Sequence, residues 1–217
     1  MPKTAPWLSV ITGPDGSGKS TACSLVRAKL ETHLGAGRVR EVSVWDCLSE
    51  GAGVRPAFTS QQDAARYLAD LDGSSRTLFI FHAMSRALQL ALKSDAQVLL
   101  LNGYWYKYAV SELGYGVARG VVLGAAQGFP RPDQVFYLEI DPKTAWERRG
   151  AATVYEQGAA GNSGAVAQPV ETKFLAFQEK LAQIWKSLEA ELSASQPSQI
   201  WEHLPAGFSA AERAGEI

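Results

Sequence analysis

The sequence predicts an α/β fold in which a parallel, five-stranded sheet is doubly wound, with helices on both of its faces. Three observations support this prediction. Short apolar runs, several rich in β-branched residues, alternate with longer segments that have the hydrophobic period of a helix. The first run leads through a glycine-rich turn into a helix, as in a strand–loop–helix unit. The chain has 217 residues, which is enough for one sizeable core.

Five segments are predicted to be strands of this sheet. Each is short, and most are rich in valine, isoleucine, leucine or aromatic residues. They are residues 7–12, 39–45, 97–102, 134–140 and 199–201. Right-handed crossovers between parallel strands would bring the loops that follow them to one edge of the sheet.

Helices are predicted between these strands. They are residues 21–34, 61–71, 74–92, about 104 to about 118, 143–149 and 171–192. The helix at 74–92 is apolar on most sides, so we expect it to be buried against the sheet or against a partner subunit, which leaves a homodimer open. Residues from 207 onward are expected to form a polar tail.

The segment 151–169 differs in composition from the rest of the chain. It is rich in glycine and alanine, lacks a core pattern, and is long for a loop in a compact domain. We therefore expect one domain over residues 1–217, with a lid-like segment at about 150–170.

The bulk composition excludes several classes of function. A net charge of -1 provides no general field that would favour nucleic acid or an anionic membrane. The N-terminus is too short and polar for a signal peptide, and no apolar run reaches the length of a membrane span. Cys23 and Cys47 form no disulfide or metal pattern. We expect a cytoplasmic protein without nucleic-acid or membrane partners.

Residues 13–20, with the sequence GPDGSGKS, match the G-x-x-x-x-G-K-[ST] pattern of a phosphate-binding P-loop. The glycines allow a tight turn that directs backbone N–H groups inward as a nest for anions. Lys19 would reach the β- and γ-phosphates, and the Ser20 hydroxyl would ligate Mg²⁺. The expected nucleotide-binding residues are Gly13, Asp15, Gly16, Ser17, Gly18, Lys19, Ser20 and Thr21.

This motif predicts a P-loop NTPase fold with ATP and Mg²⁺ as its cofactors. Two residues at the ends of predicted strands bear on the metal. Asp46 is a candidate metal ligand beside Ser20, with a capping carboxylate as an equal alternative. Asn102 stands where many P-loop enzymes have an aspartate that organises magnesium, and it brings no negative charge.

Several cationic and aromatic residues are candidates for binding a phosphate acceptor. Arg55 lies in a predicted loop, where a solvated arginine is the alternative. Arg86 shares a helix face with His82; the alternatives are a structural ion pair for Arg86 and an ordinary helix histidine for His82. The aromatic run at 103–108 predicts a wall on which a base stacks, with Lys107 near its phosphate; a packed helix start is the alternative.

Arg148 and Arg149 end a predicted helix at the foot of the lid-like segment. We expect them to clamp a phosphoryl group during its transfer, because cations there would neutralise developing charge. The alternative is a basic helix C-terminus that the helix dipole favours.

These residues resemble those of thymidylate kinases, which carry an acidic residue inside the P-loop, as Asp15 is here. Residues 82–86 stand where the family has Phe-x-x-x-Arg, whose aromatic stacks on thymine and whose arginine binds the acceptor nucleotide. Residues 102–104 stand where it has Asp-Arg-Tyr, and Glu112 falls near a base-contacting glutamine.

The resemblance extends over most of the chain, since residues 133–149 and 171–185 look like the elements before and after the family's lid. It implies that Asp15 touches the acceptor sugar. Together with the candidates above, the expected catalytic residues are Lys19, Arg148, Arg149 and Asp15. The expected acceptor-binding residues are Asp15, Arg55, His82, Arg86, Tyr104, Lys107 and Glu112.

Three departures from the family pattern concern the acceptor. His82 replaces the stacking phenyl, Asn102-Gly103 replaces Asp-Arg, and Glu112 replaces glutamine. The expected function is an ATP-dependent phosphotransferase that moves the γ-phosphate to a nucleoside monophosphate, with a thymidylate-like acceptor in an altered pocket. A nucleoside or other small-molecule kinase and a catalytically inactive ATP-binding protein are the alternatives.

Overall fold

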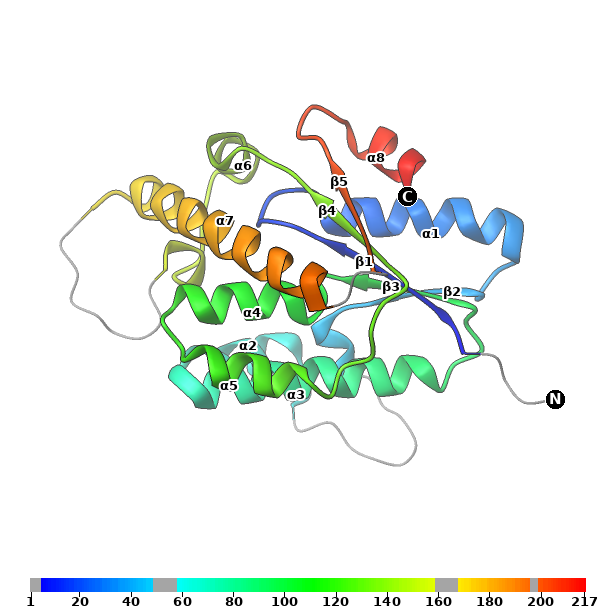
Figure 1. Ribbon diagram of the computed structural model, residues 1–217, viewed down its shortest axis with the longest axis horizontal. Helices are drawn as coiled ribbons and strands as arrows, with labels where there is room; N and C mark the ends of the chain where they lie inside the picture. The colour runs from blue at the N-terminus through cyan, green and yellow to red at the C-terminus, as the bar shows by residue number, and fades with distance from the viewer. Residues whose placement is uncertain (1–4, 49–57, 159–167, 196–198) are drawn as a thin grey trace.

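The fold is built on a parallel sheet of five strands, as the sequence predicts (Figure 1). The computed structural model describes residues 5–48, 58–158, 168–195 and 199–217. The strands are β1 (Trp7–Thr12), β2 (Val39–Val42), β3 (Val98–Asn102), β4 (Gln134–Leu138) and β5 (Ile200–Leu204). They lie in the order β2-β3-β1-β4-β5, and every neighbouring pair is parallel.

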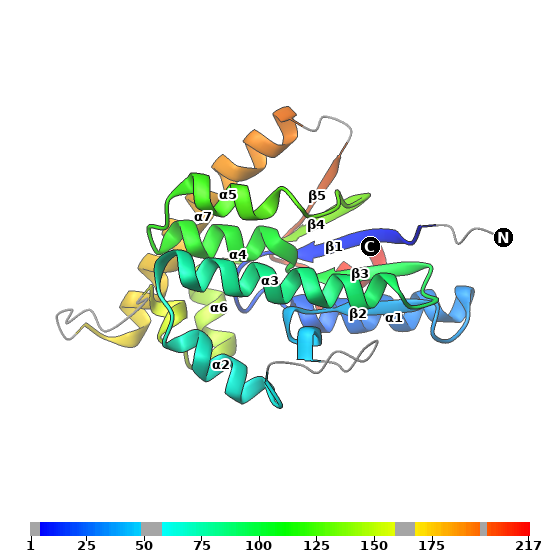
Figure 2. The same ribbon diagram turned by 90° about the horizontal axis from the view of Figure 1, so that it is seen from below.

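Helices cover both faces of this sheet. They are α1 (Lys19–Leu34), α2 (Gln61–Ala69), α3 (Gly73–Leu92), α4 (Tyr104–Gly114), α5 (Arg119–Ala126), α6 (Pro142–Arg149), α7 (Val170–Ser195) and α8 (Ala210–Glu216), with short 3-10 turns η1 (Val44–Leu48) and η2 (Tyr155–Gln157). Helices α1 and α8 pack together on one face. Helices α3, α4 and α5 pack side by side across the other, where Figure 2 shows them in front of the sheet.

Two apolar cores result, one on each face of the sheet. The larger core joins β1 and β3 to α3, α4 and α7. The smaller core joins the opposite face of the same strands to α1 and α8. Within the described residues no helix is both long and apolar enough to cross a bilayer.

Four local features differ from the sequence-based expectation. The second strand stops at Val42, because the Asp46 carboxylate accepts a hydrogen bond from the Ser43 N–H at 2.6 Å and turns the chain into η1. The helix expected at 104–118 ends at Gly114, and α5 is a separate helix after Gly116, whose φ is +89°.

The last strand and the C-terminus are more ordered than expected. The strand β5 runs to Leu204 rather than ending at Trp201. The expected polar tail contains α8, whose first turn is closed by a reciprocal capping box between Ser209 and Glu212. A buried residue, Arg213, anchors this helix to the rest of the molecule.

Gly114 lies at a tight contact between α4 and α7. A Cβ at this position would lie 2.5 Å from Leu181 Cδ2 and 3.1 Å from Phe177 Cε2. We expect Gly114→Ala to lower the free energy of unfolding by about 1–3 kcal/mol, because the extra methyl overpacks this contact. Urea unfolding measures the change.

The matched control is Gly124→Ala in α5, where an added Cβ has no neighbour within 4 Å. This substitution should raise stability by about 0.5–1 kcal/mol, because alanine has the higher helix propensity. Equal effects of the two substitutions would show that α4 and α7 do not meet at Gly114.

Candidate active site

The P-loop joins β1 to α1 and lies at the carboxyl edge of the sheet. Its turn depends on Gly13, whose φ is +139°; a Cβ there would lie 2.5 Å from the Leu138 carbonyl oxygen of β4. Gly16 and Gly18 also have positive φ, at +84° and +91°. Only glycine adopts such a series without strain, so the loop backbone can curl around an anion.

Lys19 starts α1 and folds back over this loop. Its Nζ donates hydrogen bonds to the carbonyl oxygens of Gly13 at 3.0 Å and Pro14 at 2.6 Å. Burial, together with the nearby cation of Lys107, lowers the pKa of Lys19 to about 7. An arriving polyphosphate would offer the ammonium group a stronger partner than these carbonyls.

Ser20 and Asn102 meet where the P-loop helix faces the end of β3. The Asn102 amide Nδ2 donates to Ser20 Oγ at 3.0 Å. Asp46 caps η1 instead, through its bond to the Ser43 N–H. No group of three or more carboxylate, histidine or cysteine side chains that could hold a metal occurs in the described part of the chain. The oxygens of Ser20 and Asn102 fit Mg²⁺ held mainly by nucleotide phosphates and water.

Asp15, inside the P-loop, is joined to Lys107 in the first turns of α4. The Lys107 Nζ lies 2.6 Å from Asp15 Oδ1. Burial alone would raise the pKa of Asp15, but Lys107 and Lys19 together hold it well below its usual range. Burial alone would lower the pKa of Lys107, but Asp15 outweighs it and raises that pKa. Both groups therefore stay charged at neutral pH.

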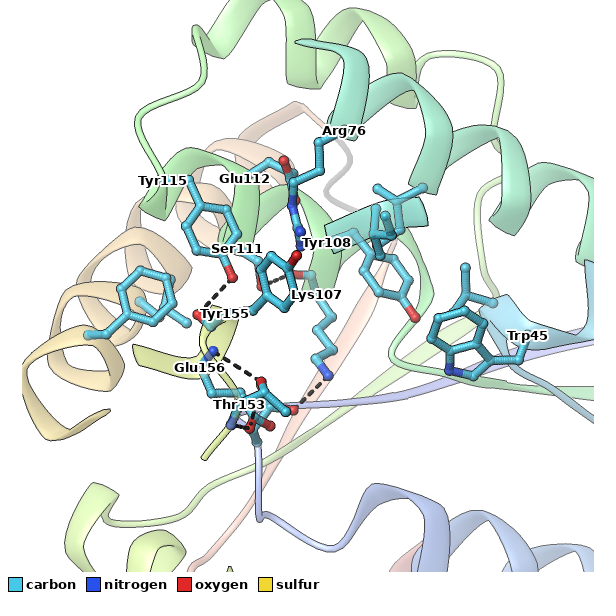
Figure 3. A pocket seen from close by; sticks show the side chains of 16 residues that line it. Trp45, Arg76, Lys107, Tyr108, Ser111, Glu112, Tyr115, Thr153, Tyr155 and Glu156 are labelled. Carbon is cyan, nitrogen blue, oxygen red and sulfur yellow. Dashed lines mark hydrogen bonds and ion pairs between the residues drawn. The ribbon is translucent and has the colours of Figure 1, made fainter. Parts of the chain in front are cut away.

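A cavity of about 230 Å³ opens beside this ion pair (Figure 3). Lys107, which pairs with Asp15, lies toward one end, and Arg76 and Glu112 lie at the other. The lining also includes aromatic and polar side chains: Trp45, Tyr108, Ser111, Tyr115, Thr153, Tyr155 and Glu156. The cavity thus adjoins the P-loop and has charged groups at both ends and aromatic rings along its walls.

Arg76 and Glu112 form a buried ion pair between α3 and α4. Arg76 Nε lies 3.0 Å from Glu112 Oε1, and the Thr77 hydroxyl donates to Glu112 Oε2 at 3.2 Å. Burial raises the pKa of Glu112, although Arg76 opposes the shift. The guanidinium carbon lies 5.0 Å from the ring centre of Tyr115 and 4.2 Å from that of Tyr155. The buried Arg76 Nη1 has no hydrogen-bond partner.

The sequence did not single out Arg76. The available signal was a charged residue in an otherwise apolar helix, which requires a partner when buried. Its partner, Glu112, lies 36 residues further along the chain. Helix periodicity does not reveal a pairing between two separate helices.

The structure places His82 and Arg86 away from this cavity. His82 is exposed on α3. Arg86 Nε donates to the Cys47 carbonyl oxygen at 2.9 Å and so ties α3 to η1. Neither side chain lines the cavity. Arg55 lies outside the described residues.

The aromatic wall expected from residues 103–108 is mostly core. Tyr104 is fully buried, and its hydroxyl donates to the Pro130 carbonyl oxygen at 2.6 Å. Trp105 and Tyr106 also belong to the larger core. Tyr108 is the aromatic residue of this run that lines the cavity, together with Lys107. The structure agrees with the packed helix start for Tyr104, because its ring lies against Phe129 and its hydroxyl bonds to Pro130, in the segment that follows α5.

Arg148 and Arg149 end α6 near the P-loop. Arg149 Nη2 lies 2.7 Å from Glu156 Oε1, and its charge contributes to the lowered pKa values of both Asp15 and Lys19. Arg148 is exposed. Arg149 is therefore part of the electrostatic surroundings of the loop.

The lowered pKa of Lys19 gives a pH prediction for phosphate binding. Bound phosphate should restore a high pKa, so between pH 7 and 9 binding of ATP should take up a proton and weaken by up to about tenfold per pH unit. The pKa of Asp15 is lowered and that of Lys107 is raised, so neither group titrates in this pH range. Calorimetry in buffers of different ionisation enthalpy measures the uptake.

Lys19→Arg is the matched control, because a guanidinium stays charged throughout this range. It should bind ATP without proton uptake. Proton-independent binding by the unaltered protein would show that Lys19 is already charged before ATP arrives.

Comparison with known proteins places this geometry in a family. The chain is 30% identical over 168 residues to the thymidylate kinase of Shewanella sp. (strain MR-4), which covers 69% of this chain and 74% of that protein. It is 29% identical over 147 residues to the thymidylate kinase of Francisella tularensis subsp. novicida (strain U112), covering 64% and 67% respectively. No family model matches the chain.

A solved structure of thymidylate kinase from Candida albicans resembles this fold, with a TM-score of 0.61 and 16% sequence identity over 98% of this chain and 89% of that one. At that identity the likeness concerns the fold, which is the P-loop NTPase α/β fold expected from the sequence. The relatives' identity and coverage, the parallel sheet and the P-loop agree: this chain is a phosphotransferase that belongs to the thymidylate kinase family.

Proposed function

We propose that this protein is an ATP- and Mg²⁺-dependent nucleoside monophosphate kinase whose acceptor binds in the cavity that the P-loop, α3, α4 and η2 line. The observation that carries the proposal is the Asp15–Lys107 pair, which connects the P-loop directly to that cavity. A phosphoryl donor in the loop and an acceptor in the cavity would therefore be neighbours. Phosphoryl transfer requires such positioning more than it requires covalent chemistry by the protein.

The donor side rests on the P-loop. The N–H groups of residues 13–20 would cradle the donor phosphates, with Lys19 on their β- and γ-oxygens. Ser20 would contribute its hydroxyl to Mg²⁺, and Asn102 would orient that hydroxyl. Arg149, with Arg148, would neutralise charge on the transferring group.

Lys107 is the best-placed cation for the acceptor phosphate. Family members have an arginine at the position that Gly103 occupies here, and Gly103 has no side chain to bind phosphate. An added Cβ at Gly103 would lie 3.3 Å from Lys107 Cδ, so the Lys107 stem covers the space beside Gly103. Lys107 supplies charge there, without the two-point geometry of a guanidinium.

The far end of the cavity is suited to the base of the acceptor. The unpartnered Arg76 Nη1 would donate to a carbonyl oxygen, and Glu112 would accept from an adjacent N–H. Tyr108 and Tyr155 offer rings for stacking. These residues would bind the acceptor, the role that the resemblance assigns to His82 and Arg86. Thymidylate is the default acceptor by resemblance, although the pocket is altered.

We expect thymidylate to be a weaker acceptor here than the family pattern implies. The stacking phenyl and the phosphate-binding arginine are both absent, and each lost charged hydrogen bond costs about 1.5–3 kcal/mol if nothing replaces it. A cytoplasmic location and a homodimer stay predictions from the sequence.

The central test is ADP production by the purified protein with ATP, Mg²⁺ and a panel of nucleosides and their monophosphates. A monophosphate should be preferred over its nucleoside, and Lys19→Ala should abolish turnover. Lys107→Met should raise the KM for the monophosphate about ten- to a hundredfold, because one charged hydrogen bond is lost. Lys186→Met, at an exposed position on α7, is the control and should change nothing.

Two results would contradict this proposal. Preference for an uncharged acceptor, with no effect of Lys107→Met, would identify a nucleoside or other small-molecule kinase. Tight binding of ATP without turnover on the whole panel would identify a catalytically inactive member of the family.

A second prediction concerns the metal. Asn102→Asp should lower the Mg²⁺ concentration that gives half-maximal activity, because it places a carboxylate beside Ser20 Oγ. We change Asn102 alone, because Gly103 has a φ of +82°, which strains any residue with a side chain.

Asp46→Asn is the control for the metal experiment. Its carboxylate caps η1, so the Mg²⁺ requirement should stay the same while stability falls slightly. A raised Mg²⁺ requirement in Asp46→Asn, with none of the expected gain in Asn102→Asp, would transfer the metal role to Asp46.

A further inference from the structure

A buried arginine from the last helix lies directly behind the P-loop. Arg213, in α8, is 2% exposed. Its Nη1 donates to the Ser17 carbonyl oxygen at 2.8 Å. Its Nη2 donates to the carbonyl oxygens of Glu139 at 2.8 Å and Pro205 at 3.0 Å. One guanidinium thus ties together the P-loop and the segments that follow β4 and β5.

Burying a guanidinium costs free energy unless it is hydrogen-bonded, and here the three acceptors are backbone carbonyls. We therefore ask what these hydrogen bonds do besides packing α8. A P-loop that directs its N–H groups toward an anion turns carbonyl groups to its outer side. The Ser17 carbonyl is such a group, and Ser17 lies between two glycines that do not restrain the backbone. The hydrogen bond from Arg213 to the Ser17 carbonyl restrains the backbone of the loop from its outer side.

The hydrogen bond from Arg213 to the Ser17 carbonyl also affects an N–H group on the inner side of the loop. The Ser17 carbonyl belongs to the peptide group whose N–H is that of Gly18. A charge-assisted bond at the carbonyl oxygen polarises the peptide and makes its N–H a stronger donor. Gly18 is the N-cap of α1, which begins at Lys19, and this is where the P-loop offers its donors to phosphate.

We propose that Arg213 is a positioning residue for the phosphates of the donor nucleotide, and that α8 is therefore part of the donor site. The inference rests on the proposed function, because it takes ATP as the donor. It assigns Arg213 no contact with substrate. Its effect should fall on the donor and spare the acceptor, because no residue of α8 lines the acceptor cavity and Asp15 is the P-loop residue that does.

The test compares Arg213→Met, which keeps an unbranched apolar stem but removes the charge and the donors, with Arg213→Lys, which keeps the charge. The dissociation constant of Mg²⁺–ATP, measured by calorimetry, should rise about ten- to a hundredfold in Arg213→Met and less in Arg213→Lys. The KM for the acceptor should stay the same. The amide resonance of Gly18 should move in the nucleotide-free variant.

Arg119→Met is the matched control, since Arg119 is an exposed arginine that pairs with Glu191. It should leave ATP binding and the Gly18 resonance unchanged. Urea unfolding without ligand records how much each substitution destabilises the fold. If Arg213→Met does not fold, Arg213→Lys is the test variant. Weaker ATP binding by Arg213→Lys, with an unchanged KM for the acceptor, would then support the inference.

Three outcomes would overturn the inference. The first is ATP binding by folded Arg213→Met that equals that of the unaltered protein, or such binding by Arg213→Lys where Arg213→Met does not fold. The second is an equal loss at donor and acceptor that lysine does not rescue, which would reduce Arg213 to a stabiliser of the fold. The third is a failure of the unaltered protein to bind ATP, and that result would also contradict the proposed function.

Discussion

The ion pair between Asp15 and Lys107 joins the P-loop to α4, the two elements on which the candidate site depends. Asp15 comes from the turn after β1, and Lys107 comes from the helix after β3. The strands β1 and β3 are neighbours in a parallel sheet, so their carboxyl ends meet at one edge and these side chains come within reach of each other. Since both groups stay charged, the pair holds the cavity against the P-loop before any ligand arrives.

The sequence predicted the parts of the structure that depend on local pattern. The strand–loop–helix unit around residues 13–20, the parallel sheet and most helices follow from periodicity and from glycine placement. The missed elements depend on particular side chains. The turn η1 forms because Asp46 caps it, and α8 is anchored by the hydrogen bonds that Arg213 makes to distant carbonyls.

The candidate site was predicted less completely than the fold. The P-loop lysine and Lys107 were identified, because each lies in or near a recognisable motif. Of the Arg76–Glu112 pair at the far end of the cavity, the sequence analysis identified Glu112 but not Arg76. Two residues on separate helices contact each other only through tertiary packing, and one sequence does not encode such a contact in its spacing.

The backbone at Gly103 has an evolutionary consequence. Gly103 and Tyr104 both have positive φ, at +82° and +51°, and the Lys107 stem occupies the space that a side chain at 103 would enter. An arginine at 103 would cost strain of order 1–3 kcal/mol and would also require the lysine to move. Under the proposed function the two positions would therefore be epistatic, because a side chain at 103 displaces the lysine that would bind the acceptor phosphate.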